Sequence, residues 1–119
     1  MDRNEIKAAL KLFINTEIKR KVHDFPNGPV SFNHIGDESF EDTEHQWWRV
    51  SFGMGSEVQM FPVRISYSKW LNAVQIELYG LKGRTILDRA YVQHHGPDDG
   101  FQEVHFENEY EPFLEDTNA

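Results

Sequence analysis

Cysteine is absent from this chain of 119 residues. Its absence excludes disulfide bonds, thiolate nucleophiles and zinc sites with sulfur ligands, and it fits a reducing, cytoplasmic environment. No apolar run approaches the roughly 18 residues that a membrane-spanning helix needs. The charged start of the chain, residues 2–5, is unlike a signal peptide. We therefore expect a cytoplasmic chain that does not cross a membrane.

Positive charge is scarce as well, because 12 Lys and Arg residues stand against 20 Asp and Glu residues. The net charge of -8 argues against attraction of the whole surface to nucleic acid or anionic lipid and favours a basic partner. The negative charge is concentrated in two stretches. Residues 36–44 hold five carboxylates, and residues 93–119 hold eight with no Lys or Arg among them.

Apolar side chains recur at helical spacing over residues 3–22, which predicts one amphipathic helix. Asp2 or Asn4 can cap its start. Two prolines and a glycine in residues 25–29 predict its end. The apolar stripe that we expect to face the core consists of Ile6, Ala9, Leu10, Phe13, Ile14, Ile18 and Val22.

Beyond residue 29 the apolar period changes from 3.6 to 2, which predicts strands. The expected strands cover residues 30–35, 47–53, 58–66, 73–79, 84–92 and 103–107, and residues 36–44 are expected to form an acidic loop. Pro62 predicts an edge or a bulge in its strand. The sequence therefore predicts a single α+β domain over 1–119, with the helix packed on a curved antiparallel meander of four to six strands. An acidic segment from about residue 107 is expected to be a tail.

Carboxylates interleaved with aromatic side chains offer both charge and anchors to a partner protein. Trp47 and Trp48 face opposite sides of a strand, so one of them is expected on the outer face, and the sequence does not say which. The predicted partner-binding residues are Glu103, Glu107, Glu109, Tyr110, Glu111, Phe113, Asp37, Glu38, Glu41 and Trp47.

Histidines are the other candidates for chemistry. His94, His95, Asp98 and Asp99 have the ligand types of a metal site, but adjacent histidines on a strand point to opposite faces. No nucleophile elbow, phosphate-binding loop or helical metal motif occurs. We therefore expect no catalytic residue, no metal and no cofactor.

The sequence thus favours a non-catalytic interaction protein, of the inhibitor or immunity type, that binds a basic nucleic-acid-handling protein. One alternative is an enzyme or small-ligand binder with a pocket between helix and sheet, where a carboxylate lies beside His34, His45 or His94. Another is a nucleic-acid platform on the strands, for which we expect the basic residues Arg49, Arg64, Lys69, Arg84 and Arg89.

Overall fold

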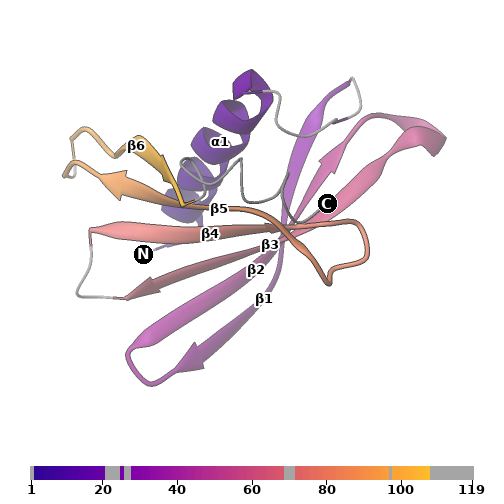
Figure 1. Ribbon diagram of the computed structural model, residues 1–119. Coiled ribbons are helices and arrows are strands. Elements are labelled where there is room, and N and C mark those ends of the chain that lie inside the picture. The colour runs from indigo at the N-terminus through magenta and orange to yellow at the C-terminus, as the bar shows by residue number, and fades with distance from the viewer. Residues whose placement is uncertain (1, 21–24, 26–27, 69–71, 97, 108–119) are drawn as a thin grey trace, which may run out of the picture.

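One helix precedes a six-stranded sheet in the computed structural model, which describes residues 2–20, 25, 28–68, 72–96 and 98–107. The strands pair antiparallel in chain order, and the sheet is not closed into a barrel (Figure 1). The predicted α+β class and meander order are therefore confirmed. The elements are α1 (Arg3–Arg20), β1 (Val30–Phe40), β2 (Thr43–Phe52), the short 3-10 helix η1 (Gly55–Glu57), β3 (Gln59–Ser68), β4 (Ala73–Tyr79), β5 (Ile86–His94) and β6 (Phe101–Phe106).

Helix α1 begins where predicted, because the Asp2 Oδ1 atom accepts a hydrogen bond from the Glu5 N–H at 2.9 Å. The helix covers one face of the sheet (Figure 1). Its buried apolar side chains are Ile6, Ala9, Leu10, Phe13 and Ile14. Within the part of the chain that the structure describes, no helix is long and apolar enough to cross a membrane.

The predicted stripe is wrong at Ile18, whose side chain is 40% exposed, while Glu17 is fully buried. The reason is the period of 3.6 residues, which brings residue 17 back to the centre of the stripe defined by Ile6, Leu10 and Phe13. Residue 18 falls at its margin. Val22 lies outside the described residues.

The core fills the space between α1 and the concave face of the sheet. Alternate residues of β2, among them Trp48 and Val50, point into it and are nearly or fully buried. Trp48 is therefore the core tryptophan of the pair. The other strands contribute buried side chains on the same face, including Phe61, Val63, Ile65, Val74, Ile76, Leu78, Ala90, Val92 and Phe106.

The predicted acidic loop over residues 36–44 is wrong. Residues 36–44 are not a loop, because β1 and β2 continue through them and pair from Val30 with Phe52 to Phe40 with Thr43. A bulge between His34 and Gly36 adjusts the register of this long edge hairpin.

Pro62 lies in an interior strand and not at an edge of the sheet. Its missing N–H is tolerated because the pairing of β3 with β4 begins only at Val63.

An acidic end of the sheet as candidate functional site

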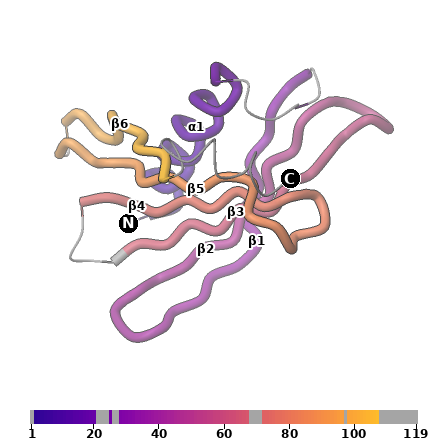
Figure 2. The backbone as a smooth tube through the Cα atoms, in the orientation of Figure 1, coloured from indigo at the N-terminus to yellow at the C-terminus, as the bar shows by residue number. Residues whose placement is uncertain are grey.

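Every second turn of an antiparallel meander lies at the same end of the sheet. The ends of β1, β3 and β5 therefore share one end of the sheet with the starts of β2, β4 and β6, as Figure 2 shows. The start of α1 lies there too, since the Arg3 Nη2 atom is 3.8 Å from Asp37 Oδ2. The topology thus brings together segments that are far apart in the sequence.

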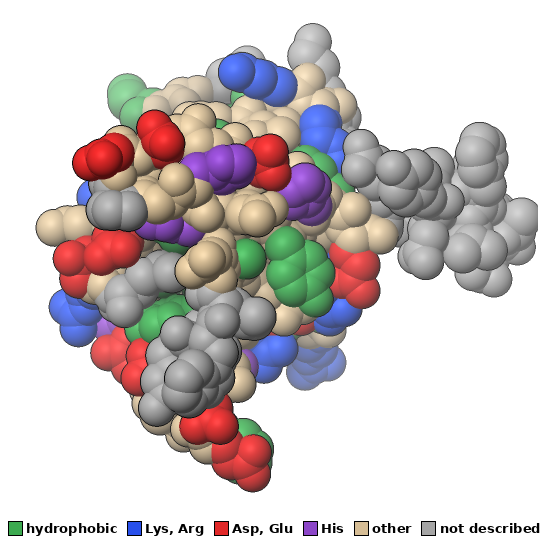
Figure 3. Space-filling model, turned by 90° about the vertical axis from the view of Figure 1, so that its left-hand side faces the viewer, with side chains coloured by type: hydrophobic (Ala, Val, Ile, Leu, Met, Phe, Trp, Pro, Cys, Tyr) green, Lys and Arg blue, Asp and Glu red, His purple; other side chains and the backbone are tan. Residues whose placement is uncertain are grey.

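We call this the acidic end, because its turns and the helix start carry Asp2, Glu5, Asp37, Glu38, Glu41, Asp42, Glu44, Asp98, Asp99 and Glu103. Figure 3 looks onto this end and shows red carboxylate side chains at its left and at its lower tip, with histidines in its upper half. The opposite end holds the last helical turn with Lys19 and Arg20, and the β4–β5 turn with Lys82 and Arg84. Carboxylates of the described residues are therefore concentrated at the acidic end, although Arg3 lies there too and Glu57 lies at the opposite end.

The β1–β2 hairpin forms one side of the acidic end. Asp37, Glu38 and Glu41, all predicted partner-binding residues, are exposed on it. Phe40 lies next to its turn with 69% of its surface exposed. Phe40 is not among the predicted partner-binding residues, although its place as the single aromatic residue within the acidic run 36–44 is a signal that points to it. The hairpin therefore presents an aromatic side chain among carboxylates.

Contacts beneath the hairpin fix it to the core. The His34 Nε2 atom lies 2.7 Å from Asp37 Oδ1, and its ring packs edge-on against Trp48 with centroids 5.5 Å apart. The Trp48 Nε1–H donates to Gln46 Oε1 at 2.9 Å. This chain of contacts, which we call the ladder, runs from Trp48 in the core to the Asp37 carboxylate on the hairpin.

A small polar pocket of about 240 Å³ lies beside this ladder, lined by Asp37, Glu38, Ser39, Glu44, His45, Gln46 and Tyr67. Burial, together with a hydrogen bond to Glu44, raises the pKa of Tyr67 to about 12. The Tyr67 hydroxyl therefore stays protonated and serves as a hydrogen-bond donor near the hairpin. His45 Nδ1 is 2.7 Å from the Ser66 Oγ atom on the neighbouring strand.

Two predicted carboxylates, Glu103 of β6 and Glu107 directly after it, have intramolecular partners. Glu103 Oε2 lies 3.1 Å from His105 Nε2 and 3.6 Å from His95 Nε2. The hydrogen bond with His105 lowers the pKa of Glu103. Glu107 contacts Arg89 at 3.1 Å, away from the acidic end. The Arg89 guanidinium therefore offsets the charge of Glu107, while the lowered pKa keeps Glu103 ionised at the acidic end.

On the face of the sheet away from α1, Glu77 lies between two arginines. Arg64 Nε donates to Glu77 Oε1 at 2.7 Å, and Arg89 Nη2 donates to Glu77 Oε2 at 2.7 Å. Glu77 is only 2% exposed. The proposed nucleic-acid platform thus has two of its arginines already occupied by a carboxylate. Lys69 lies outside the described residues.

Trp47 is the outward-facing tryptophan, but it is half-buried and not a free anchor. Its ring packs against Tyr79 with centroids 5.6 Å apart, and the Arg64 guanidinium lies 5.8 Å from its centroid. The remaining predicted partner-binding residues, Glu109, Tyr110, Glu111 and Phe113, lie outside the described residues.

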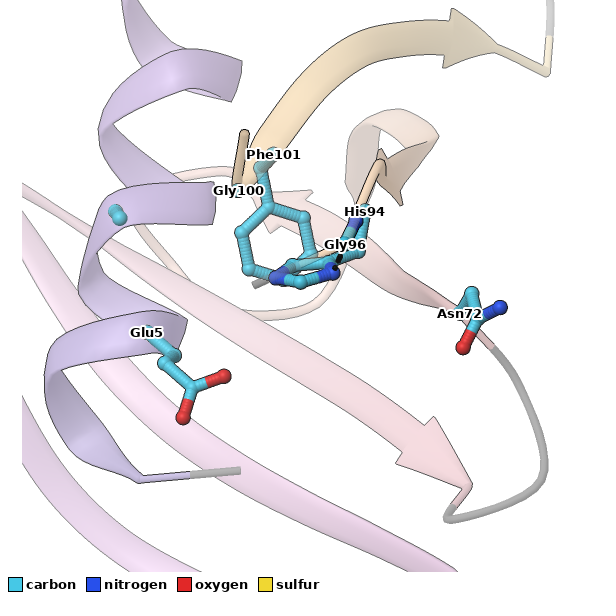
Figure 4. Close-up of a pocket in the computed structure, with 7 residues that line it drawn as sticks. Glu5, Asn72, His94, Gly96, Gly100 and Phe101 are labelled. Carbon is cyan, nitrogen blue, oxygen red and sulfur yellow. Dashed lines mark hydrogen bonds between the residues drawn. The ribbon is translucent and has the colours of Figure 1, made fainter. Parts of the chain in front are cut away.

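A larger pocket of about 570 Å³ opens at the acidic end between α1 and the β5–β6 turn. Figure 4 shows His94 and Phe101 at one wall, with Glu5 and Asn72 on opposite sides. Its lining residues are Glu5, Ala8, Asn72, His94, Gly96, Gly100 and Phe101. The alternative prediction of a pocket with a histidine and a carboxylate thus has a counterpart here.

Among the described residues, no group of three or more His, Asp or Glu side chains is suited to hold a metal ion. His94 therefore belongs to no such cluster there.

In comparisons with family models, curated proteins and solved structures, nothing matches this chain. Function is therefore argued from the geometry of the acidic end.

Proposed function

We propose that this chain binds a basic partner protein through the acidic end. The observation that carries the proposal is the convergence of carboxylates from the helix start, the β1–β2 hairpin and the β5–β6 turn on one end of the sheet. Mutual repulsion makes such a concentration costly, and a cationic partner relieves it. A nucleic-acid-handling protein fits best, because its phosphate-binding surface is basic.

Two features support a protein partner over a small cation. The acidic end runs from β1 to β6, which is up to roughly 24 Å at the usual strand spacing and comparable to a protein interface. Phe40, 69% exposed beside Glu38 and Glu41, offers an aromatic anchor of the kind that interface centres contain. The protein would act without catalysis, by occupying the partner's surface as an inhibitor or immunity protein does. A cytoplasmic location fits the cysteine-free composition.

The test compares two variants of equal net charge. Glu38→Gln combined with Glu41→Gln and the single Glu57→Lys each change the charge by the same amount, but Glu57 lies in η1 at the opposite end. Proteins captured by the wild type from an extract of the source cells at about 50 mM salt are identified and purified. Association rates are then measured for the wild type and both variants at two salt concentrations.

We expect the hairpin variant to associate several-fold more slowly than the Glu57→Lys variant, and the difference to shrink at high salt because screening weakens steering. Phe40→Ser should mainly accelerate dissociation, since it removes a contact without changing charge. Thermal melts check that all variants fold. Equal association rates for the two charge variants, or capture of no basic protein, would overturn the proposal.

A further inference from the structure

We propose that the pocket formed by Glu5, Ala8, Asn72, His94, Gly96, Gly100 and Phe101 binds a lysine side chain presented by the partner. This inference rests on the proposed function, because the partner supplies the lysine. The pocket is nevertheless a property of one chain and can be tested without the partner.

The walls of the pocket suit the aliphatic stem of lysine. The rings of His94 and Phe101 meet edge to face with centroids 4.9 Å apart and form one wall. The methyl group of Ala8 and the backbones of Gly96 and Gly100 form much of the rest. Four methylene groups can therefore pack against largely apolar walls.

The polar groups of the pocket suit an ammonium group. The Glu5 carboxylate supplies negative charge from α1, and the polar Asn72 side chain lies on the opposite side (Figure 4). Asp98 and Asp99 in the adjacent turn add to the negative potential. Among the described lining residues there is no Lys or Arg, so an anionic ligand is disfavoured.

A backbone hydrogen bond fixes the His94 ring in this wall. Its Nδ1 atom accepts a hydrogen bond from the Gly96 N–H at 3.1 Å. The ring contributes an aromatic surface against which the lysine stem can pack.

The experiment titrates the isotope-labelled full chain with Nα-acetyl-lysine methylamide and follows backbone amide shifts by NMR. The norleucine and arginine derivatives are the matched probes, since the first lacks the charge and the second carries it in a plane. We expect saturable shifts at Asn72, Gly96 and Gly100 with the lysine derivative and no saturation with norleucine, and the arginine derivative measures how far charge alone accounts for binding.

Variants locate the site. Glu5→Gln should raise the dissociation constant at least about fivefold, whereas Glu57→Gln, which removes the same charge at the other end, should leave it within about twofold. Ala8→Leu should block the pocket without unfolding the chain, because Ala8 is exposed on the helix surface. Equal binding of all three probes, no binding of the lysine derivative, or equal effects of the two glutamine variants would overturn the inference.

The two proposals fail separately. If partner association depends on Glu38 and Glu41 but the lysine derivative does not bind, the pocket inference alone is wrong. If the lysine derivative binds as expected but partner association ignores the hairpin charges, the proposed function is wrong and the site is one for a free small amine. Titration with 2-phenylethylamine then measures that second source directly.

Discussion

The Glu17 carboxyl of α1 and the Asp88 carboxyl of β5 share one buried site and hydrogen-bond to each other. The Arg20 Nη1 atom contacts both, at 3.1 Å from Glu17 Oε1 and 3.2 Å from Asp88 Oδ2. Burial, and then the neighbouring Asp88, raises the pKa of Glu17 from 4.5 to about 8. The pair therefore retains a proton at neutral pH in the folded chain.

This raised pKa predicts a pH-dependent stability. Between pH 4.5 and about 8 the unfolded chain loses the Glu17 proton while the folded chain keeps it. The stabilisation is therefore fully present below pH 4.5, and the free energy of unfolding falls as the pH rises toward 8. Glu17→Gln carries no charge at any pH and should remove this fall. From pH 5 to pH 8 the free energy of unfolding of the variant should therefore rise relative to that of the wild type by on the order of a few kcal/mol.

Urea denaturation of the wild type and Glu17→Gln at pH 5, 6, 7 and 8 measures the effect. Glu57→Gln is the control, because Glu57 is exposed and its removal should leave the slope of stability against pH unchanged. Parallel curves for the wild type and Glu17→Gln would show that Glu17 ionises alike in both states.

The burial of α1 predicts unequal costs for two of its apolar residues. Phe13 is fully buried, with its ring centroid 5.9 Å from that of Phe106, and Phe13→Ala should lower the free energy of unfolding by about 3 to 5 kcal/mol. Ile18 is 40% exposed, so Ile18→Ala should cost less than about 1 kcal/mol. Chemical denaturation gives both values, and similar costs would mean that α1 is turned differently on the sheet.

The buried Glu77, which lies between Arg64 and Arg89, is expected to contribute more to stability than the exposed Glu107. Glu77→Gln should lower the free energy of unfolding by about 2 kcal/mol, because Arg64 and Arg89 lose their shared anion at a buried position. Glu107→Gln removes a partner of Arg89 that is itself 47% exposed, and should cost less than about 1 kcal/mol. Melting curves of both variants at low and high salt test this prediction. A larger loss of stability for Glu107→Gln than for Glu77→Gln would contradict the buried position of Glu77 between the two arginines.

Much of the fold was predictable because the relevant signals are local. The helical spacing of Ile6, Leu10 and Phe13 predicts one buried helix face, and alternation over 73–79 predicts β4 with its observed bounds. The acidic run 36–44 misled the strand prediction, since composition alone does not distinguish a polar loop from the polar strands of an edge hairpin.

The sequence by itself determined the α+β class, the cysteine-free chemistry and the negative charge of two separate stretches. Only the tertiary structure decided that residues 37–44 and 98–103 lie at the same end with the start of α1, that Trp48 rather than Trp47 enters the core, and that Glu103 is paired with histidines. Side-chain periodicity depends on neighbours in the chain. Which segments meet depends on how many strands separate them and on their register, and no local pattern encodes either.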